Sequence, residues 1–286
     1  MDARAKVNLT LEILGVREDG YHEIRSLVMP VSLADEISVR PSDTITLQVD
    51  SSALDDASRM GDVEDNLAFR AALLLQRVTG CRKGAAISLC KRIPVGSGLG
   101  GGSADAAAVL AALNGLWELG LARSELVRLG AELGSDVPAL AMGGVVLMEG
   151  RGERVVAEMP CAPLDMVLVF PGVFTSTAEV YANCVPQLTT GGQILDNMRR
   201  ALSGGEASAV AAALCNGLTE AAEVLHPEIA HARMALLAAG ALGASMSGSG
   251  SCVFGLARDA AHASALAREL SREGFDARAV RTCPVM

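Results

Sequence analysis

Alternating and uninterrupted apolar runs dominate the first third of the chain and predict a β-sheet there. The first expected strands are residues 7–14, 24–31, 36–39 and 45–49. Asp19-Gly20 lies between the first two runs and is typical of a hairpin turn. Further strands are expected at residues 86–93, 145–148, 166–170, 244–246, 253–256 and 277–280.

Apolar residues at helical spacing predict helices in both halves of the chain. Residues 103–119 are rich in Ala and Leu and are expected to form a buried helix. A helix over residues 66–78 should be capped near Asp65, and a helix over residues 124–133 should end at Gly134. The other expected helices are residues 206–216, 227–239 and 260–272. Because strands and helices are mixed along the whole chain, an α+β or α/β fold with packed layers is favoured.

A polar stretch at residues 149–154 is the expected boundary between two domains, residues 1–152 and 153–286. Two Gly-rich polar stretches in the second half, residues 189–192 and 203–205, are expected to be loops.

Composition and charge exclude several classes of function. The 24 Lys and Arg residues against 33 Asp and Glu give a net charge of −9 and a pI near 5.0, which opposes general affinity for nucleic acid or an anionic membrane. Aromatic residues make up only 3%, which argues against a stacking platform for single strands. No apolar run reaches the ~20 residues of a membrane helix. Seven scattered Cys residues indicate reduced thiols in a cytoplasmic protein rather than a metal site.

The strongest chemical signal is the glycine-rich segment that begins at Pro94. Five of the seven residues 96–102 are Gly. Glycine lets backbone amides converge, and Ser103 is a suitable cap for the helix that follows. A loop of this kind before a helix binds anions such as phosphate, and a tight packing turn is the competing interpretation.

Two other phosphate-binding patterns compete for this segment. The Walker A spacing, Gly-x-x-x-x-Gly-Lys-Ser/Thr, is absent. Gly96-x-Gly98-x-x-Gly101 matches the dinucleotide fingerprint, but the acidic residue which that fingerprint requires has only Glu118 as a candidate. Since Glu118 ends a predicted helix instead of a strand, an NAD(P)-binding oxidoreductase stays open as the weaker alternative.

Residues 94–107 resemble the second motif of the GHMP small-molecule kinases. Three other segments resemble that family in the expected order, namely residues 5–9 with 19–22, residues 133–138 and residues 244–252. Two positions depart from the family pattern. Arg4 stands where Pro is usual, and Asn216-Gly217 replaces the usual Asn-Asp.

The resemblance implies a two-domain α+β fold with an N-terminal nucleotide-binding domain and a C-terminal ferredoxin-like substrate domain. It further implies an enzyme that uses ATP and Mg²⁺ to phosphorylate the 2-hydroxyl of 4-diphosphocytidyl-2-C-methyl-D-erythritol, a cytidine diphosphate-linked polyol of the non-mevalonate isoprenoid pathway. The metal is expected mainly on phosphates and water, with Ser103 as the one suggested protein ligand. The first motif begins by residue 5, which leaves no room for an uncleaved transit peptide and fits the cytoplasm. The oligomeric state is left open.

The resemblance also implies a role for individual residues. Asp136 would accept the proton of the substrate hydroxyl, and Lys6 would pair with Asp136 and aim it. The expected ATP-binding residues are Pro94, Gly96, Gly98, Leu99, Gly100, Gly101, Gly102 and Ser103. The expected substrate-binding residues are Asn8, Tyr21, His22, Thr177 and Tyr181. A second loop, Ser247, Gly248, Ser249 and Gly250, is expected to close on the phosphates or the substrate.

Plainer interpretations stand beside these roles. Taken alone, Asp136 is a turn or cap residue, Lys6 is a surface residue of a strand, and Tyr181 packs one face of a helix. Another GHMP kinase, for homoserine or mevalonate, is the nearest alternative, and Tyr21-His22 with the triple glycine favours the cytidyl substrate instead. A ligand sensor without activity on the same fold is a further alternative, which the presence of Lys6 and Asp136 opposes.

Overall fold

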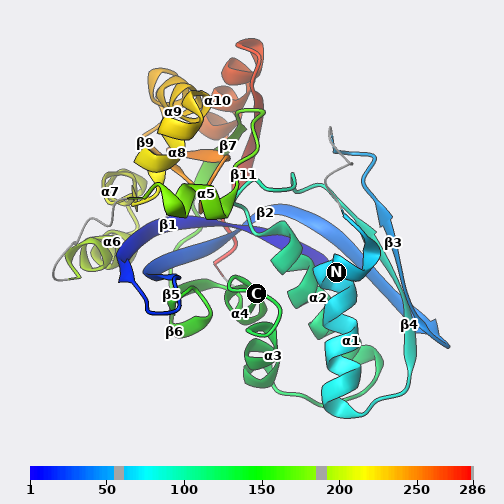
Figure 1. The fold of residues 1–286 in the computed structure, drawn as a ribbon. Helices are drawn as coiled ribbons and strands as arrows, with labels where there is room; N and C mark the ends of the chain where they lie inside the picture. The colour runs from blue at the N-terminus through cyan, green and yellow to red at the C-terminus, as the bar shows by residue number, and fades with distance from the viewer. Residues whose placement is uncertain (55–60, 185–191, 285–286) are drawn as a thin grey trace.

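The computed structural model describes residues 1–54, 61–184 and 192–284, and it contains two β-sheets that face each other (Figure 1). In the described chain the larger sheet has seven strands, with β3-β4-β2-β1-β8 in order; β5 also pairs with β2, and β6 pairs with β5. Its strands are β1 (Asp2–Val16), β2 (His22–Ser42), β3 (Ile45–Asp50), β4 (Gly84–Cys90), β5 (Val145–Gly150), β6 (Arg154–Met159) and β8 (Cys215–Asn216).

The longest strand corrects one prediction. Residues 24–31 and 36–39 were expected to form separate strands, but both belong to β2. Ala34 and Asp35, which lie between the two expected strands, stay extended because they pair with Arg4 and Ala3 of β1. On the other side β5 pairs with the first part of β2 and β4 with its last part. Arg4 is also accommodated, since β1 runs through it and its register with β2 shifts between Arg4 and Lys6.

Four helices cover one face of the larger sheet (Figure 1). They are α1 (Leu67–Thr79), α2 (Gly101–Leu116), α3 (Arg123–Gly130) and α4 (Val137–Met142), and the short 3-10 helix η2 (Val63–Asp65) precedes them. The cap of α1 is Asn66, one residue after the expected Asp65, and its side chain accepts a hydrogen bond from the amide of Ala68. The Ala-rich α2 is buried as predicted, because its small side chains let it pack closely against α1 and β2.

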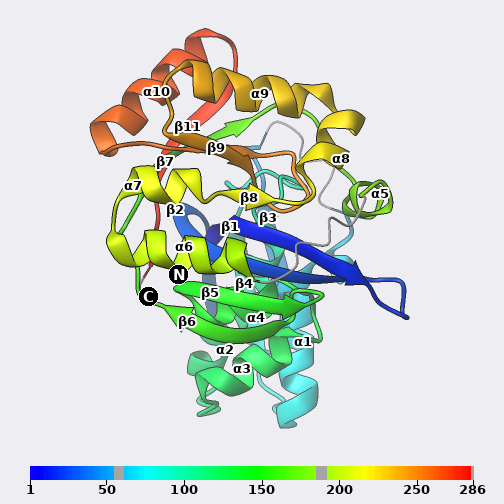
Figure 2. The same cartoon turned by 90° about the vertical axis from the view of Figure 1, so that its left-hand side faces the viewer.

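The smaller sheet has the predicted ferredoxin-like topology. Its order is β11-β7-β10-β9, and every neighbouring pair is antiparallel. The strands are β7 (Asp165–Phe170), β9 (Gly243–Met246), β10 (Val253–Leu256) and β11 (Asp276–Arg281). The helices α9 (Pro227–Ala238) and α10 (Ala260–Arg272) lie on its outer side, as Figure 2 shows, and α8 (Thr219–Leu225) packs into the same core.

The inner face of the smaller sheet packs against the larger one. Leu168 and Phe254 meet Leu9 and Leu27 in one buried cluster, which α6 (Gln193–Gly204) and α7 (Ala207–Ala212) complete. The helix expected over residues 206–216 is therefore shorter than predicted. Cys215–Asn216 leaves the helix and pairs in parallel with Thr10–Leu11 of β1.

The polar stretch expected to mark a domain boundary has a structural role in the larger sheet. Residues 151–153 form the turn between β5 and β6, and β6 extends that sheet beyond residue 152. Of the two expected loops, 203–205 is the end of α6 with the residue after it, because the helix continues to Gly204. Residues 189–191 of the other lie outside the described residues. No described helix combines the length and the apolar composition that crossing a membrane requires.

Candidate active site

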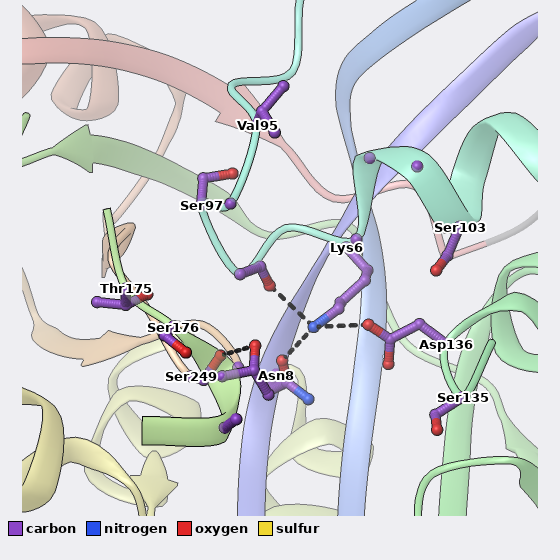
Figure 3. Close-up of a pocket in the computed structure, with 18 of the residues that line it drawn as sticks. Lys6, Asn8, Val95, Ser97, Ser103, Ser135, Asp136, Thr175, Ser176 and Ser249 are labelled. Atoms are coloured by element: carbon purple, nitrogen blue, oxygen red, sulfur yellow. Dashed lines mark hydrogen bonds and ion pairs between the residues drawn. The ribbon is translucent and has the colours of Figure 1, made fainter. Parts of the chain in front are cut away.

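A cavity of about 1020 Å³ lies where the two sheets and the glycine-rich segment meet. Its walls come from β1, the glycine-rich segment, the first turns of α2, the residues before α4 and the segment that leads into α5 (Thr177–Ala182). This volume is at the upper end of the range for small-molecule sites, so it has room for more than one ligand. Figure 3 shows the side chains of β1 and of the loops pointing into this space.

Lys6 is the central cation of the cavity, and its side chain is only 4% exposed. Its Nζ donates to Oδ1 of Asn8 at 2.7 Å and to the carbonyl oxygen of Gly98 at 2.9 Å. It also lies 3.5 Å from Oδ2 of Asp136, as Figure 3 shows. Asn8 is fixed in turn, because its amide donates to Ser26 Oγ at 2.7 Å. The ammonium therefore has a fixed position beside a carboxylate.

Asp136 is the N-cap of α4. A residue before Pro is usually extended, but Val137 is helical although Pro138 follows it. Proline is tolerated in a first helical turn, where its missing N–H is not needed, and Val137 is fully buried in the helical layer. The carboxylate stays about one third exposed and faces the cavity.

The glycine-rich segment crosses the cavity between Lys6 and α2 (Figure 3). Gly98 and Gly100 have φ values of +75° and +70°, which side chains rarely adopt. A Cβ on Gly98 would lie 2.1 Å from the carbonyl oxygen of Ser247, so only glycine fits there. Gly100 is the N-cap of α2, which corrects the prediction that Ser103 is the cap. Ser103 instead lies in the first turn and lines the cavity.

The loop after β9 docks onto the glycine-rich segment from the other sheet. Ser247 Oγ donates to the carbonyl oxygen of Gly98 at 3.0 Å, and the amide of Cys252 donates to the carbonyl of Ser97 at 3.0 Å. The hydroxyls of Ser249 and Thr177 lie 2.9 Å apart. These contacts join the two Gly/Ser loops into one wall of the cavity.

Asn216 supports this wall, although the sequence left its role unassigned. Its side-chain amide donates to the carbonyl oxygens of Met246 and Gly248, both at 2.8 Å. Gly217 replaces the residue usual in the family, and a Cβ there would meet Ile13 Cγ1 at 3.3 Å. The strand β8 thus anchors the loop of one sheet to β1 of the other.

Tyr21, His22 and Tyr181 line the cavity where the hairpin between β1 and β2 meets α5, and this part of the cavity is its aromatic end. The rings of His22 and Tyr181 are 5.0 Å apart between centroids, at an angle of 43°. Tyr21 is 56% exposed, as expected for the tip of the predicted hairpin. Burial, with a smaller contribution from Asp136, raises the pKa of the Tyr181 hydroxyl well above its usual value. The tyrosine therefore stays neutral at physiological pH.

Most of the residues predicted for the site share this cavity. The residues that line it are Lys6, Asn8, Tyr21, His22, Pro94, Gly96, Gly98, Gly100, Gly101, Gly102, Ser103, Asp136, Thr177, Tyr181, Gly248 and Ser249. Three others stand behind the wall. Leu99 is buried in the core between the sheets, Ser247 is fully buried, and Gly250 lies behind the second loop with its carbonyl oxygen close to Gly98.

A buried charged cluster at the α2 end of the cavity was missed by the sequence analysis. Lys91 Nζ donates to Asp105 Oδ2 at 2.8 Å and to Asp35 Oδ2. Asp105 Oδ1 is buried without a hydrogen-bond partner. Burial raises the pKa of Asp105 to about 7, although Lys91 opposes the shift. The sequence carries no spacing signal for this cluster because its members come from β2, the residue after β4, and α2.

Comparison with known proteins agrees with this geometry. Residues 66–144 match the family described as GHMP kinases N terminal domain, and residues 195–276 match GHMP kinases C terminal. The chain is 46% identical to the 4-diphosphocytidyl-2-C-methyl-D-erythritol kinase of Pelotomaculum thermopropionicum, over 90% of this chain and 88% of that protein. It is 45% identical to the enzyme of that name from Symbiobacterium thermophilum, over 99% of both.

A solved structure gives the same result for the fold. The crystal structure of a 4-(cytidine 5'-diphospho)-2C-methyl-D-erythritol kinase superposes with a TM-score of 0.82 at 37% identity, and covers 99% of this chain and 98% of that one. The dinucleotide alternative fails on the topology, because β4 lies in a mixed sheet between antiparallel β2 and parallel β3. The chain therefore belongs to the GHMP kinase family, in the group of the 4-diphosphocytidyl-2-C-methyl-D-erythritol kinases.

Proposed function

We propose that this protein transfers the γ-phosphoryl group of ATP to the 2-hydroxyl of 4-diphosphocytidyl-2-C-methyl-D-erythritol. The observation that carries the proposal is the Lys6–Asp136 ion pair, which lies in one cavity between the glycine-rich segment and the aromatic end. The named activity of the relatives at 45% and 46% identity supports the same substrate. Homoserine and mevalonate have no nucleobase that could stack on the rings of the aromatic end.

Asp136 is the proposed general base. Its carboxylate is partly exposed and faces the cavity, so it can reach the hydroxyl of a bound substrate. Lys6 holds the carboxylate in place from 3.5 Å, and Asn8 and Gly98 hold Lys6. As the hydroxyl oxygen bonds to the γ-phosphorus, the bond between that phosphorus and the β,γ-bridging oxygen breaks and ADP leaves. The hydroxyl proton passes to Asp136, and the fixed ammonium stabilises the negative charge on the transferring group.

The glycine-rich segment is the proposed binding site for the phosphates of ATP. Gly100 caps α2, so the amides that start this helix are free for an anion, and the positive end of the helix points the same way. A Cβ on Gly100 would lie 3.2 Å from Lys6 Cε and 3.5 Å from Asp136 Oδ2, so the absence of a side chain there keeps the space beside the proposed base open for a phosphate. Pro94, Gly96, Gly101, Gly102 and Ser103 would complete this subsite, with Leu99 packing beneath it.

Mg²⁺ is proposed to enter with the nucleotide. Among the described residues there is no cluster of three or more His, Cys, Asp or Glu side chains that could hold a metal ion. Ser103 and Asp136 are nevertheless oxygen donors on the cavity wall, which fits a metal held mainly by phosphates and water. The metal would neutralise phosphate charge during transfer.

The aromatic end is the proposed site of cytosine. Tyr21, His22 and Tyr181 offer ring faces and one imidazole edge, and Thr177 with Ser249 continues the wall toward the reacting end.

The other proposals concern the whole chain. Residues 1–152 are proposed as the domain that binds ATP, and residues 153–286 as the domain that binds the substrate. The cytoplasm is proposed as the compartment.

A coupled assay for ADP tests this function. The purified protein should form ADP from ATP and Mg²⁺ with 4-diphosphocytidyl-2-C-methyl-D-erythritol, and omission of either Mg²⁺ or the acceptor should abolish turnover. Homoserine and mevalonate serve as matched acceptors. Faster turnover of either one would overturn the substrate assignment and leave the kinase assignment intact.

A further inference from the structure

Arg151 lies in the turn between β5 and β6, within the polar stretch expected to be a domain boundary, and it lines the cavity. Its guanidinium carbon lies 4.8 Å from the centroid of the Tyr21 ring, which is the geometry of a cation–π contact. The register of the sheet causes this approach, because Gly150 pairs with Ile24, two residues after His22.

The same turn also approaches the reacting end of the cavity. Gly152 has a φ of +108°, and a Cβ on it would lie 3.4 Å from Cβ of Ser135, the neighbour of Asp136. The turn that carries Arg151 therefore contacts the aromatic end through Arg151 and the Asp136 segment through Gly152. In the substrate the diphosphate has the corresponding position, since it joins the cytidine to the polyol that carries the reacting hydroxyl.

Charge supports this correspondence. Three Lys and Arg side chains line the cavity in the described part of the chain, namely Lys6, Lys91 and Arg151. Lys6 is occupied by Asn8 and Gly98, and Lys91 by two carboxylates. The closest acid to the Arg151 guanidinium is Glu153, with 4.0 Å between Nε and Oε2. Arg151 thus keeps donors available, and an arginine presents its donors in a fork that fits phosphate.

We propose that Arg151 binds the diphosphate of the cytidyl substrate while its guanidinium stays over Tyr21. The inference rests on the proposed function, and it names a specificity-determining residue for it. In this role Arg151 raises the affinity for ligands in which a phosphate is attached to the cytidine, and it contributes little to the affinity for cytidine alone. Since the net charge of the protein is −9, this local cation also offsets repulsion of an anionic substrate.

The test compares the binding of two ligands by the wild type and by two Arg151 variants. Binding of cytidine and of cytidine diphosphate is measured by calorimetry with the nucleotide site saturated by a non-hydrolysable ATP analogue. The wild type should bind the diphosphate roughly 5- to 20-fold more tightly than cytidine, the range of a partly exposed charge-assisted contact. Arg151→Gln should bring that ratio close to one, and Arg151→Lys should keep part of it.

The matched control is Arg154→Gln on the neighbouring strand, because Arg154 is 60% exposed and pairs with Glu149 outside the cavity lining. It should leave the ratio unchanged. In turnover, Arg151→Gln should raise the KM of the cytidyl substrate by a similar factor, with kcat and the KM of ATP near wild type.

Three results would overturn the inference. Equal losses for cytidine and cytidine diphosphate in Arg151→Gln would show that Arg151 only supports Tyr21. A wild type without preference for the diphosphate would leave Arg151 no role in phosphate binding. A wild type that binds neither ligand would overturn the proposed substrate, and the inference with it. If Arg151→Gln has a lowered melting temperature, the comparison is made with Arg151→Lys instead. If this variant prefers cytidine diphosphate over cytidine by the same factor as the wild type, the planar guanidinium is not what recognises the diphosphate, and the inference is wrong.

Discussion

Lys6 donates from its ammonium to the carbonyl oxygen of Gly98 at 2.9 Å, and this bond joins the first strand to the glycine-rich segment. The backbone reinforces it, because the amide of Lys6 donates to the carbonyl of Leu99 at 2.9 Å. The proposed phosphate loop and the lysine that aims the proposed base therefore hold one another in place. A substitution in the loop should therefore also displace Lys6, and a substitution of Lys6 should also displace the loop.

Replacing Asp136 by Asn should preserve the fold and lose turnover. Asn has nearly the same shape but cannot accept a proton, and loss of a general base typically costs ~10²–10⁴-fold in kcat. The side chain is 32% exposed, so its replacement should change the melting temperature little. Ser135→Ala is the matched control beside it. A kcat within a few-fold of wild type would show that Asp136 only caps α4.

Gly98→Ala should impair both stability and ATP binding. The new Cβ would lie 2.1 Å from the Ser247 carbonyl oxygen, and the left-handed conformation alone costs about 1–2 kcal/mol. Gly115→Ala is the matched control, because Gly115 lies inside α2 and away from the cavity, and a Cβ there would meet nothing within 4 Å. Thermal melts and the KM of ATP separate the two. Equal behaviour of both variants would argue that the close approach at Gly98 is unimportant.

Gly101→Val should weaken ATP more than the cytidyl substrate, but through a different contact. A Cβ on Gly101 would meet Ile93 Cγ2 at 3.0 Å and Lys91 Nζ at 3.4 Å, so the larger side chain should push the start of α2 away from its support. The two KM values are the measurement. Equal losses for both substrates with a lowered melting temperature would indicate a packing role instead.

Tyr181→Ala should raise the KM of the cytidyl substrate roughly 5- to 150-fold, the equivalent of ~1–3 kcal/mol for a base stacked on an aromatic ring. Tyr181→Phe should be nearly silent, since stacking uses the ring and not the hydroxyl. The KM of ATP should stay close to wild type in both variants. Tyr181 also packs on the core of the smaller sheet, so some loss of melting temperature is expected. A destabilised Ala variant with an unchanged cytidyl KM would remove Tyr181 from the site.

Asp105 should make stability depend on pH. Burial raises its pKa from 3.8 to about 7, so between these values the folded protein holds a proton that the unfolded chain has released. The free energy of unfolding should then fall as pH rises through this window, by up to about 1.4 kcal/mol per pH unit. Asp105→Asn removes this dependence. The melting temperature of the wild type, relative to that of the variant, should therefore decrease from pH 4 to pH 7, and a constant difference would contradict the assignment.

Local signals were sufficient for much of this molecule. The Asp19-Gly20 turn, the Ala-rich α2 and the Pro-initiated α9 form where the spacing of apolar residues and the turn residues predicted them. The order of four short motifs indicated the kinase family, and the comparisons confirm it. Such features depend on residues close together in the chain, and those residues select a turn, a cap or a buried face in any context.

Only the tertiary structure decided which of these pieces meet. Strand pairing makes residues 24–31 and 36–39 parts of one strand, β2. It also places Cys215–Asn216 beside β1 instead of in a helix. The pairing of β2 with β5 brings Arg151 over Tyr21. The Lys91–Asp35–Asp105 cluster has the same origin, because three separate elements each bury one charge at a single point. Apolar periodicity specifies which face of an element is buried, but not which partner covers it. Packing and backbone pairing between distant segments make that choice.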